Sequence, residues 1–378
     1  MQVFTQLSHG SGVLIYPIKH LFLLHRYRHI IMDVSAYRAT QVSRGFTYRY
    51  HFTAPKEGHP TIVFIHGFPS TAYDWHHQIK FFKEKGYGLV VPDMLGYGQT
   101  SIVFDAASYK HTLLAKDVMD VLDTEKIQKA IVIGHDWGST IVSAIVQIYG
   151  DRVIAAGFLA AGYTVPNPKF NYEAVMAFTK EKLGYEALGY WEFFAGEGAD
   201  KIIEENWDAF QALVWCEDPK EWVTYLSPRG ALKSYLTSGQ KVTPASWLTA
   251  EVSVTFTYGA LWSRILTLPL PCHTQDRKTQ MQTLLMGGFT GPLNYYTVVV
   301  SGLQAEDDAT IPEDKYVTDK PVFFGVTVED DIMAPMQKAT VEKFAKNGTI
   351  KEFKTGHWVQ MQAPEELNKE LLNWIESL

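Results

Sequence analysis

Cysteine is scarce in this sequence, whose 378 residues include only Cys216 and Cys272. Two cysteines provide neither a disulfide framework nor the ligand spacing of a metal site, and a reducing compartment such as the cytoplasm is the default expectation. Long runs of basic residues are also absent, and the formal net charge is −7. Both features argue against nucleic acid or an anionic membrane as the main partner.

Hydrophobic runs long enough to cross a bilayer are missing as well. The most apolar stretch near the start, residues 13–24, is interrupted by Pro17, Lys19 and His20, whereas a membrane-spanning helix needs about 20 apolar residues. The stretch also lacks the basic start and the small-residue cleavage site of a signal peptide. We interpret residues 1–40 as an N-terminal extension outside the main fold, with a weak interfacial membrane anchor as the alternative.

The sequence does contain a series of short apolar runs that alternate with segments of helical spacing. Such runs are typical of strands buried on both faces of a parallel sheet, and their alternation with helices predicts an α/β fold. The expected strands are residues 46–53, 61–65, 88–91, 130–133, 152–159, 322–327 and 350–353. Helices are expected near residues 75–85 and 108–123, after Gly138, and from Pro364 onward.

The pattern of buried strands stops near Tyr163 and resumes at Val322. Residues 164–314 between them are rich in helical and aromatic signals. We therefore expect a mainly helical lid inserted between two parts of one sheet, residues 41–163 and 315–378. Within the lid, residues 252–279 are irregular and rich in β-branched residues, and they are either an extra loop or translated non-coding sequence.

The strongest chemical signal is an expected strand that ends in GHDWG at residues 134–138, just before a helix. In such a sharp turn small flanking residues relieve crowding, and the central side chain stands at the helix N-terminus, where backbone N–H groups stabilise negative charge. The central residue is Asp136 rather than serine, and no Gly-x-Ser-x-Gly sequence occurs elsewhere. We therefore expect a carboxylate nucleophile that forms an ester with its substrate; the alternative is a simple helix cap.

Hydrolysis of such an ester requires an activated water, and the candidate base is His357, which follows the last short strand. An acid must orient this histidine. Glu329, Asp330 and Asp331 directly follow the expected strand 322–327, at the edge where open α/β sheets place their active sites. On these grounds all three acids compete for the role.

An oxyanion formed during hydrolysis needs hydrogen-bond donors. The sequence HGFP at residues 66–69 follows another buried strand, and its turn can point the Phe68 N–H into the site. We expect this group and the Trp137 N–H to form the oxyanion hole. An ordinary turn is the alternative interpretation of HGFP.

The order nucleophile, acid and histidine, together with these motifs, resembles the epoxide hydrolase branch of the α/β-hydrolase superfamily. The matching segments are HGFP at 66–69, DMLGYG at 93–98, GHDWGS at 134–139, VEDDIMAP at 328–335 and GHW at 356–358. The resemblance implies an α/β-hydrolase fold with an aspartate nucleophile. The family's acidic motif resembles T-x-E-x-D, which maps onto Thr327, Glu329 and Asp331, so the resemblance favours Asp331 as the orienting acid.

The lid decides which bond the nucleophile attacks. Epoxide opening leaves an alkoxide that needs acidic hydroxyls, and in epoxide hydrolases these belong to two lid tyrosines. GYWEFF at residues 189–194 and LNYY at residues 293–296 resemble the two tyrosine motifs and match at Tyr190 and Tyr296. A dehalogenase would instead need donors to a halide, and Phe68 cannot donate from its side chain.

The resemblance thus implies a cofactor-independent hydrolase that uses water to convert apolar epoxides to vicinal diols. The side chains expected to contact substrate are those of Trp137, Tyr190, Tyr296 and Trp358. A haloalkane or haloacid dehalogenase on the same scaffold is the enzymatic alternative, and a non-catalytic small-molecule-binding protein is the other. The identity of the epoxide and the oligomeric state are not predictable from the sequence.

Overall fold

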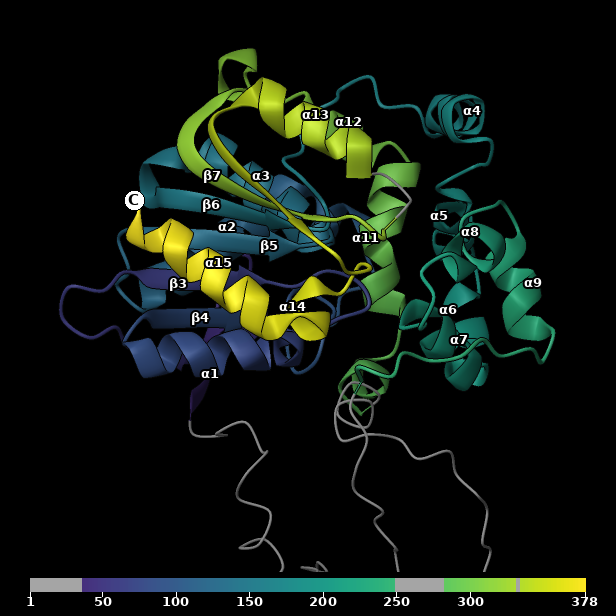
Figure 1. Ribbon diagram of the computed structural model, residues 1–378, viewed down its shortest axis with the longest axis horizontal. Helices are drawn as coiled ribbons and strands as arrows, with labels where there is room; N and C mark the ends of the chain where they lie inside the picture. The colour runs from purple at the N-terminus through teal and green to yellow at the C-terminus, as the bar shows by residue number, and fades with distance from the viewer. Residues whose placement is uncertain (1–35, 249–281, 331–333) are drawn as a thin grey trace, which may run out of the picture. The chain divides into compact units, whose positions relative to one another are not determined.

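The computed structural model describes residues 36–248, 282–330 and 334–378 (Figure 1). Most of the expected extension 1–40, the atypical stretch 252–279 and Asp331 lie outside these residues. The question of an N-terminal membrane anchor therefore lies outside them too. Within the described ranges, no helix combines the length and the apolar character that crossing a bilayer requires.

The described residues form an eight-stranded sheet with the order β1-β2-β4-β3-β5-β6-β7-β8. Its strands are β1 (Tyr37–Gln41), β2 (Thr47–Thr53), β3 (Thr61–Ile65), β4 (Gly88–Pro92), β5 (Ala130–His135), β6 (Val153–Leu159), β7 (Thr318–Thr327) and β8 (Ala345–Phe353). Strand β2 runs antiparallel to both of its neighbours, and all the other pairs are parallel. The α/β-hydrolase fold expected from the sequence is confirmed.

Helices cover both faces of the sheet, which explains why its central strands are continuous apolar runs. The helices outside the lid are α1 (His76–Lys85), α2 (His111–Thr124), α3 (Trp137–Ile148), α13 (Ala334–Phe344), α14 (Val359–Gln362) and α15 (Pro364–Glu376). Successive side chains of a strand point to opposite faces. Phe64 of β3 therefore contacts Phe82 of α1, whereas its neighbour Val63 belongs to the core cluster that includes Ile141 of α3.

The main difference between the observed and the expected strands is an additional strand at one edge of the sheet, near the N-terminus. Strand β1 begins at Tyr37, inside the expected extension, and pairs with β2 from Tyr37 to Gln41. Its residues are half-exposed or exposed, so it has no apolar run by which the sequence could reveal it. Strands β7 and β8 likewise begin before their apolar parts, at Thr318 and Ala345.

Residues 164–314, which the sequence analysis expects to form a lid, are mainly helical where they are described. Its helices are α4 (Tyr172–Leu183), α5 (Gly189–Phe194), α6 (Ala199–Glu205), α7 (Trp207–Val214), α8 (Glu221–Tyr225), α9 (Ala231–Thr237), α11 (Thr290–Val300) and α12 (Leu303–Asp308). The chain leaves the sheet after β6 and returns at β7, and these two strands are hydrogen-bonded neighbours. Helix α11 contacts both α5 and α12 (Figure 1).

Candidate active site

Asp136 stands at the junction between β5 and α3, as the GHDWG motif predicts. Its backbone has φ 54° and ψ −125°, an unusual conformation for a residue other than glycine. The strain is local, because the regular strand ends at His135 and the helix begins at Trp137. This turn presents the Asp136 carboxylate at the carboxyl edge of the parallel strands.

Glycines make this turn possible because neighbouring backbone segments pass too close for a side chain. A Cβ on Gly138 would lie 2.1 Å from the Ile65 carbonyl oxygen of β3. A Cβ on Gly134 would lie 2.4 Å from the carbonyl carbon of Gly138. The sequence spacing of the two glycines is therefore dictated by the crossing of α3 over the strand ends.

His357 faces Asp136 across the site. Its Nε2 atom lies 3.5 Å from the Asp136 Oδ2 atom, and its Nδ1 atom donates to the Asp330 carboxylate at 2.6 Å. The three side chains are at most about one-fifth exposed. The acid that contacts the histidine is thus Asp330, one residue before the Asp331 that the family motif favoured. Asp331 itself lies outside the described residues.

The charges of this group determine its protonation. Burial alone lowers the pKa of His357, but the Asp330 charge and hydrogen bonds with Asp136 and Asp330 outweigh it and raise the pKa to about 10. Burial alone raises the pKa of the Asp136 carboxyl, but the hydrogen bond and charge of His357 hold it below its ordinary value. Asp136 is therefore ionised at neutral pH, as a nucleophile must be.

The expected oxyanion hole lies beside the same carboxylate. The Phe68 N–H donates to the Asp136 Oδ1 atom at 2.8 Å. A Cβ on Gly67 would lie 2.2 Å from that oxygen and 2.7 Å from the Trp137 backbone nitrogen. The Asp136 carboxylate and both predicted donors thus border one small space, which only a glycine at position 67 leaves open.

Two histidines outside the predicted set hold this arrangement in place. His66 Nδ1 donates to the Gly67 carbonyl, and its Nε2 accepts from the Met94 N–H, each at 2.9 Å. His135 Nε2 donates to the His357 carbonyl oxygen at 2.8 Å. Both rings are fully buried. His66 is part of HGFP and His135 is part of GHDWG, and membership of these motifs is the sequence signal that could have drawn attention to them.

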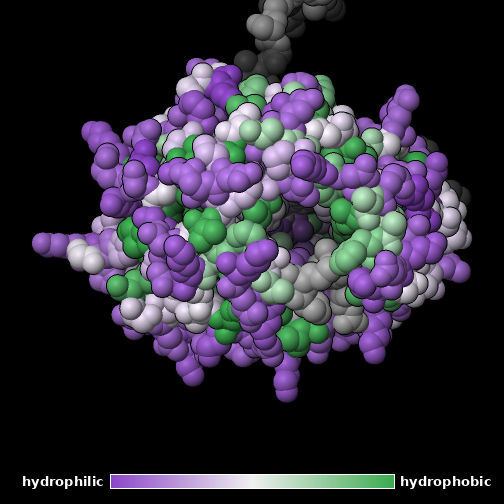
Figure 2. All heavy atoms as spheres, turned by 90° about the horizontal axis from the view of Figure 1, so that it is seen from above, coloured by the Kyte–Doolittle hydropathy of each residue, from purple (hydrophilic) through white to green (hydrophobic). Residues whose placement is uncertain are grey.

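A cavity of about 400 Å³ opens beside the catalytic candidates, lined by Asp136, Trp137, Tyr190, Trp191, Trp222 and His357 among others. Figure 2 shows the molecule hollowed on one face, with hydrophobic residues around much of the opening. Tyr190 reaches the cavity from α5, as its motif predicts. Burial and the Asp136 charge both raise the pKa of its hydroxyl, so Tyr190 is protonated and able to donate.

Tyr296 lies next to the cavity but does not line it. Its ring packs against Phe68, Trp137 and Phe194, and lies 6.0 Å from the ring of Tyr190. Burial and the Asp136 charge raise the pKa of its hydroxyl, which also receives a hydrogen bond from the Trp137 side chain. The structure therefore brings the two predicted tyrosines together, yet only Tyr190 faces the space for a substrate.

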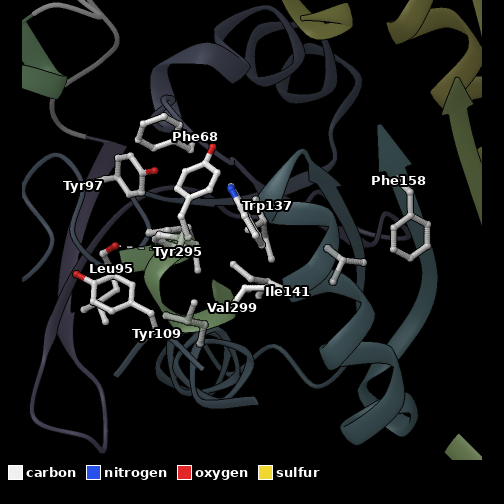
Figure 3. Packing of buried hydrophobic residues seen from close by; sticks show 14 of the residues in the cluster. Phe68, Leu95, Tyr97, Tyr109, Trp137, Ile141, Phe158, Tyr295 and Val299 are labelled. Carbon is white, nitrogen blue, oxygen red and sulfur yellow. Dashed lines mark hydrogen bonds between the residues drawn. The ribbon is translucent and has the colours of Figure 1, made fainter. Parts of the chain in front are cut away.

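The neighbouring tyrosine of the LNYY motif has a packing role. Figure 3 shows Tyr295 within the core beside Trp137, Tyr97 and Tyr109, with its hydroxyl donating to the Leu95 carbonyl at 3.3 Å. It is fully buried. This anchor fixes α11 against the loop after β4 and so determines where Tyr296 lies.

Trp358 was expected to contact substrate, and the structure corrects this. Its ring is buried and stacked on Trp215 at 5.2 Å, and its Nε1 donates to the Val214 carbonyl at 2.9 Å. It does not line the cavity. Trp358 instead ties the histidine loop to α7 of the lid, while Trp222, which the sequence did not single out, packs on the His357 ring at 5.2 Å.

The described residues contain no group of three or more histidine, cysteine or acidic side chains arranged to hold a metal ion.

Comparisons with known proteins agree with this architecture. A sequence model of the α/β-hydrolase fold matches residues 60–198. Bifunctional epoxide hydrolase 2 of Sus scrofa is 27% identical over 341 residues, which cover 87% of this chain and 53% of that protein. Epoxide hydrolase B of Mycobacterium tuberculosis is 26% identical over 355 residues, which cover 86% of this chain and 93% of that protein. The chain thus spans about half the length of the bifunctional relatives.

Solved structures show the same fold. The crystal structure of epoxide hydrolase A from Mycobacterium thermoresistibile matches with a TM-score of 0.68 and 23% identity, over 90% of this chain and 98% of that one. An epoxide hydrolase from an endophytic Streptomyces matches with a TM-score of 0.72 and 21% identity, over 90% of this chain and 95% of that one. The sheet order, the turn at Asp136 and these similarities together show that the chain has the α/β-hydrolase fold.

Proposed function

We propose that this chain is an epoxide hydrolase that opens epoxides to vicinal diols through an ester on Asp136. The observation that carries the proposal is the placement of Asp136, with Tyr190 facing the same cavity and His357 within 3.5 Å. The similarity to proteins named epoxide hydrolases over most of the chain supports it.

In the first step an Asp136 oxygen attacks a ring carbon, and the bond between that carbon and the epoxide oxygen breaks. The departing oxygen takes a proton from Tyr190. No base is required at this stage, which suits a His357 that is protonated in the free enzyme. The product of the step is an alkyl ester of Asp136 bearing a neighbouring hydroxyl.

In the second step the ester is hydrolysed. Esterification removes the Asp136 charge that helps to raise the pKa of His357, so the ring loses its proton to solvent and can accept one from water. Asp330 orients it. The resulting hydroxide attacks the Asp136 carbonyl carbon, and the Phe68 and Trp137 N–H groups stabilise the oxyanion. Cleavage of the bond between the Asp136 carbonyl carbon and the alkyl oxygen releases the diol, whose second hydroxyl takes the proton carried by the attacking hydroxide, so Asp136 returns as a carboxylate. Tyr190 regains its proton from solvent, which replaces the one that His357 gave up.

The decisive experiment measures diol formation from styrene-type and aliphatic epoxides. Asp136→Ala should lower turnover at least about a thousandfold, because the nucleophile is lost. Asp151→Ala removes an exposed carboxylate that does not line the cavity, and it should leave turnover unchanged. His357→Gln should accumulate an adduct heavier by the whole substrate, seen by mass spectrometry. Substantial diol formation by Asp136→Ala would refute the mechanism, and halide release from haloalkanes without diol formation would select a dehalogenase instead.

A further inference from the structure

The cavity continues well beyond the catalytic candidates, along one face of α3. Trp137, Thr140, Ala144 and Gln147 of this helix all line it. Their spacing of three or four residues places them on a single face. Ten residues separate the first from the last, and a helix rises about 1.5 Å per residue, so the lined face is about 15 Å long.

The middle of this cavity is apolar. Ala144 of α3 lines it together with Leu188, Val175 and Val299, which come from the residue before α5, from α4 and from α11. Apolar walls of this length favour an extended hydrocarbon body, because each buried methylene contributes about 0.8 kcal/mol.

Polar groups line the cavity near Gln147, the lining residue of α3 that is farthest along the helix from Asp136, where the Gln147 amide donates to the Thr164 carbonyl at 2.8 Å. The His111 N–H donates to the Gln304 Oε1 atom, and the Gln304 amide donates to the Asp308 carboxylate at 2.7 Å. The Asn167 N–H donates to the same carboxylate at 2.7 Å. Asp308 is partly exposed and lines the cavity. Two hydrogen bonds thus fix the position of a residue that lines the cavity.

The charges around the cavity are unbalanced. Asp136, Asp308 and Asp330 line it, whereas no lysine or arginine of the described residues does. Asp136 and Asp330 share His357, but Asp308 makes no salt bridge within the described part of the chain. Among the described residues the other histidine that lines the cavity is His111, whose pKa is lowered to about 4 by burial, so that it is neutral. An anionic group at this end would therefore meet an uncompensated carboxylate.

We propose that Asp308 is a specificity-determining residue, which makes the cavity select elongated ligands with an apolar body and an uncharged or cationic polar terminus and reject those ending in a carboxylate. This inference builds on the proposed function, since it names the class of epoxide: the reactive ring lies at Asp136 and the polar terminus at Asp308. A hydroxyl, amide or ammonium donates to the carboxylate, whereas a second carboxylate is repelled by it.

The test uses three probes without an epoxide, namely dodecylamine, dodecanamide and dodecanoate, titrated by calorimetry. The wild-type protein should bind the amide and the amine at least about tenfold more tightly than the carboxylate, a difference of about 1.4 kcal/mol. Asp308→Asn should reduce the ratio to within about threefold, and Asp308→Glu should preserve it. Equal affinity for the three probes in the wild type, or an unchanged ratio in Asp308→Asn, would overturn the inference.

Two controls locate the effect. Asp314→Asn removes an equal charge from an exposed position that does not line the cavity, and it should leave the ratio unchanged. Ala144→Phe should abolish binding of all three probes by filling the middle of the cavity, with its melting temperature measured to show that the protein is folded. Probes that still bind to folded Ala144→Phe would lie elsewhere, which would contradict the proposal.

The binding test and the activity test can fail separately. Because no probe carries an epoxide, the binding preference without diol formation would refute the proposed function and retain the specificity. The opposite outcome is diol formation at the same kcat/KM from epoxides that end in a carboxylate and from epoxides that end in an amide. It would support the proposed function and refute the specificity.

Discussion

His357 lies between the carboxylates of Asp136 and Asp330, and only one of the two changes its charge during the proposed reaction. Asp330 keeps its charge, whereas Asp136 loses its own when the ester forms. The histidine is therefore protonated when the enzyme waits for substrate and becomes basic once the ester exists. A single ring thus serves a resting state and a hydrolytic state without any movement of the backbone.

The orienting acid gives the first prediction at this scale. Asp330→Asn should lower the rate of ester hydrolysis by about a hundredfold or more, because the Nδ1 partner of His357 loses its charge. Asp331→Asn, the matched variant one residue later, should retain most of the activity. Single-turnover kinetics measure the two steps separately, and the opposite ranking of these variants would restore Asp331 to the role.

The two lid tyrosines give the second prediction at the residue scale. Tyr190→Phe should lower the rate of ester formation by about a hundredfold, since its hydroxyl faces the cavity. Tyr296→Phe should cost less, because its hydroxyl is buried among aromatic rings and bonded to Trp137. Burst-phase kinetics with a chromogenic epoxide measure the rate of ester formation in the two variants. Equal losses would mean that Tyr296 also reaches the substrate.

At the residue scale, sequence motifs pointed to side chains that the structure brings together, but they did not predict every contact. GHDWG identified Asp136 because a strained turn requires glycines at fixed spacing. The acidic triplet gave three adjacent candidates, and spacing alone does not tell which side chain points toward His357. Trp358 was misjudged for a related reason: an aromatic residue beside a catalytic histidine can face the cavity or the core, and here the Val214 carbonyl holds it in the core.

At the scale of elements, the junction of β5 and α3 is the most constrained part of the fold. Gly138→Ala should reduce the free energy of unfolding by about 3 kcal/mol, because the new methyl group would press on a backbone carbonyl that cannot move aside. Gly150→Ala is the control, since the nearest atom to its Cβ would be 4.0 Å away, and it should change stability by less than about 0.5 kcal/mol. Urea denaturation compares them; similar stabilities would show that α3 has room to shift.

Elements buried on both faces were predictable because burial leaves an apolar run in the sequence. The five apolar runs of β3 to β7 were all located, although β7 begins earlier than its apolar part. Strand β1 was missed because a half-exposed edge strand has no such run. The course of the lid helices could not be derived, since their packing depends on contacts such as Tyr295 with Leu95 that join distant parts of the chain.

At the scale of the whole molecule, buried histidines couple stability to pH. Burial lowers the pKa of His66 and His111 to about 4 and that of His135 to about 3. As the pH falls below about 6.5, the unfolded chain binds protons that these rings cannot, so each removes about 3 kcal/mol of stability by about pH 4. Buried Asp93, with its pKa raised to about 6, acts in the opposite direction but is a single group.

His357 acts on the alkaline side. Its raised pKa stabilises the folded protein fully below about pH 6.5, and this contribution is lost as the pH rises toward 10. The free energy of unfolding should therefore be highest near neutral pH and fall on both sides. Urea denaturation at about pH 4.5, 6.5 and 9.5 measures it, and His357→Gln should flatten the alkaline side alone. A stability that rises steadily toward either extreme would contradict this account.

The neighbouring positions of β6 and β7 have a consequence for how much sequence the lid can accept. The chain between these paired strands is already a loop of about 160 residues, and the entropy lost on closing a loop grows only with the logarithm of its length. Adding residues 252–279 to a shorter lid would therefore cost the sheet only about 0.2 kcal/mol. Lengthening the chain at that point therefore hardly changes the stability of the sheet that positions Asp136. Any larger loss of stability would concern the lid alone.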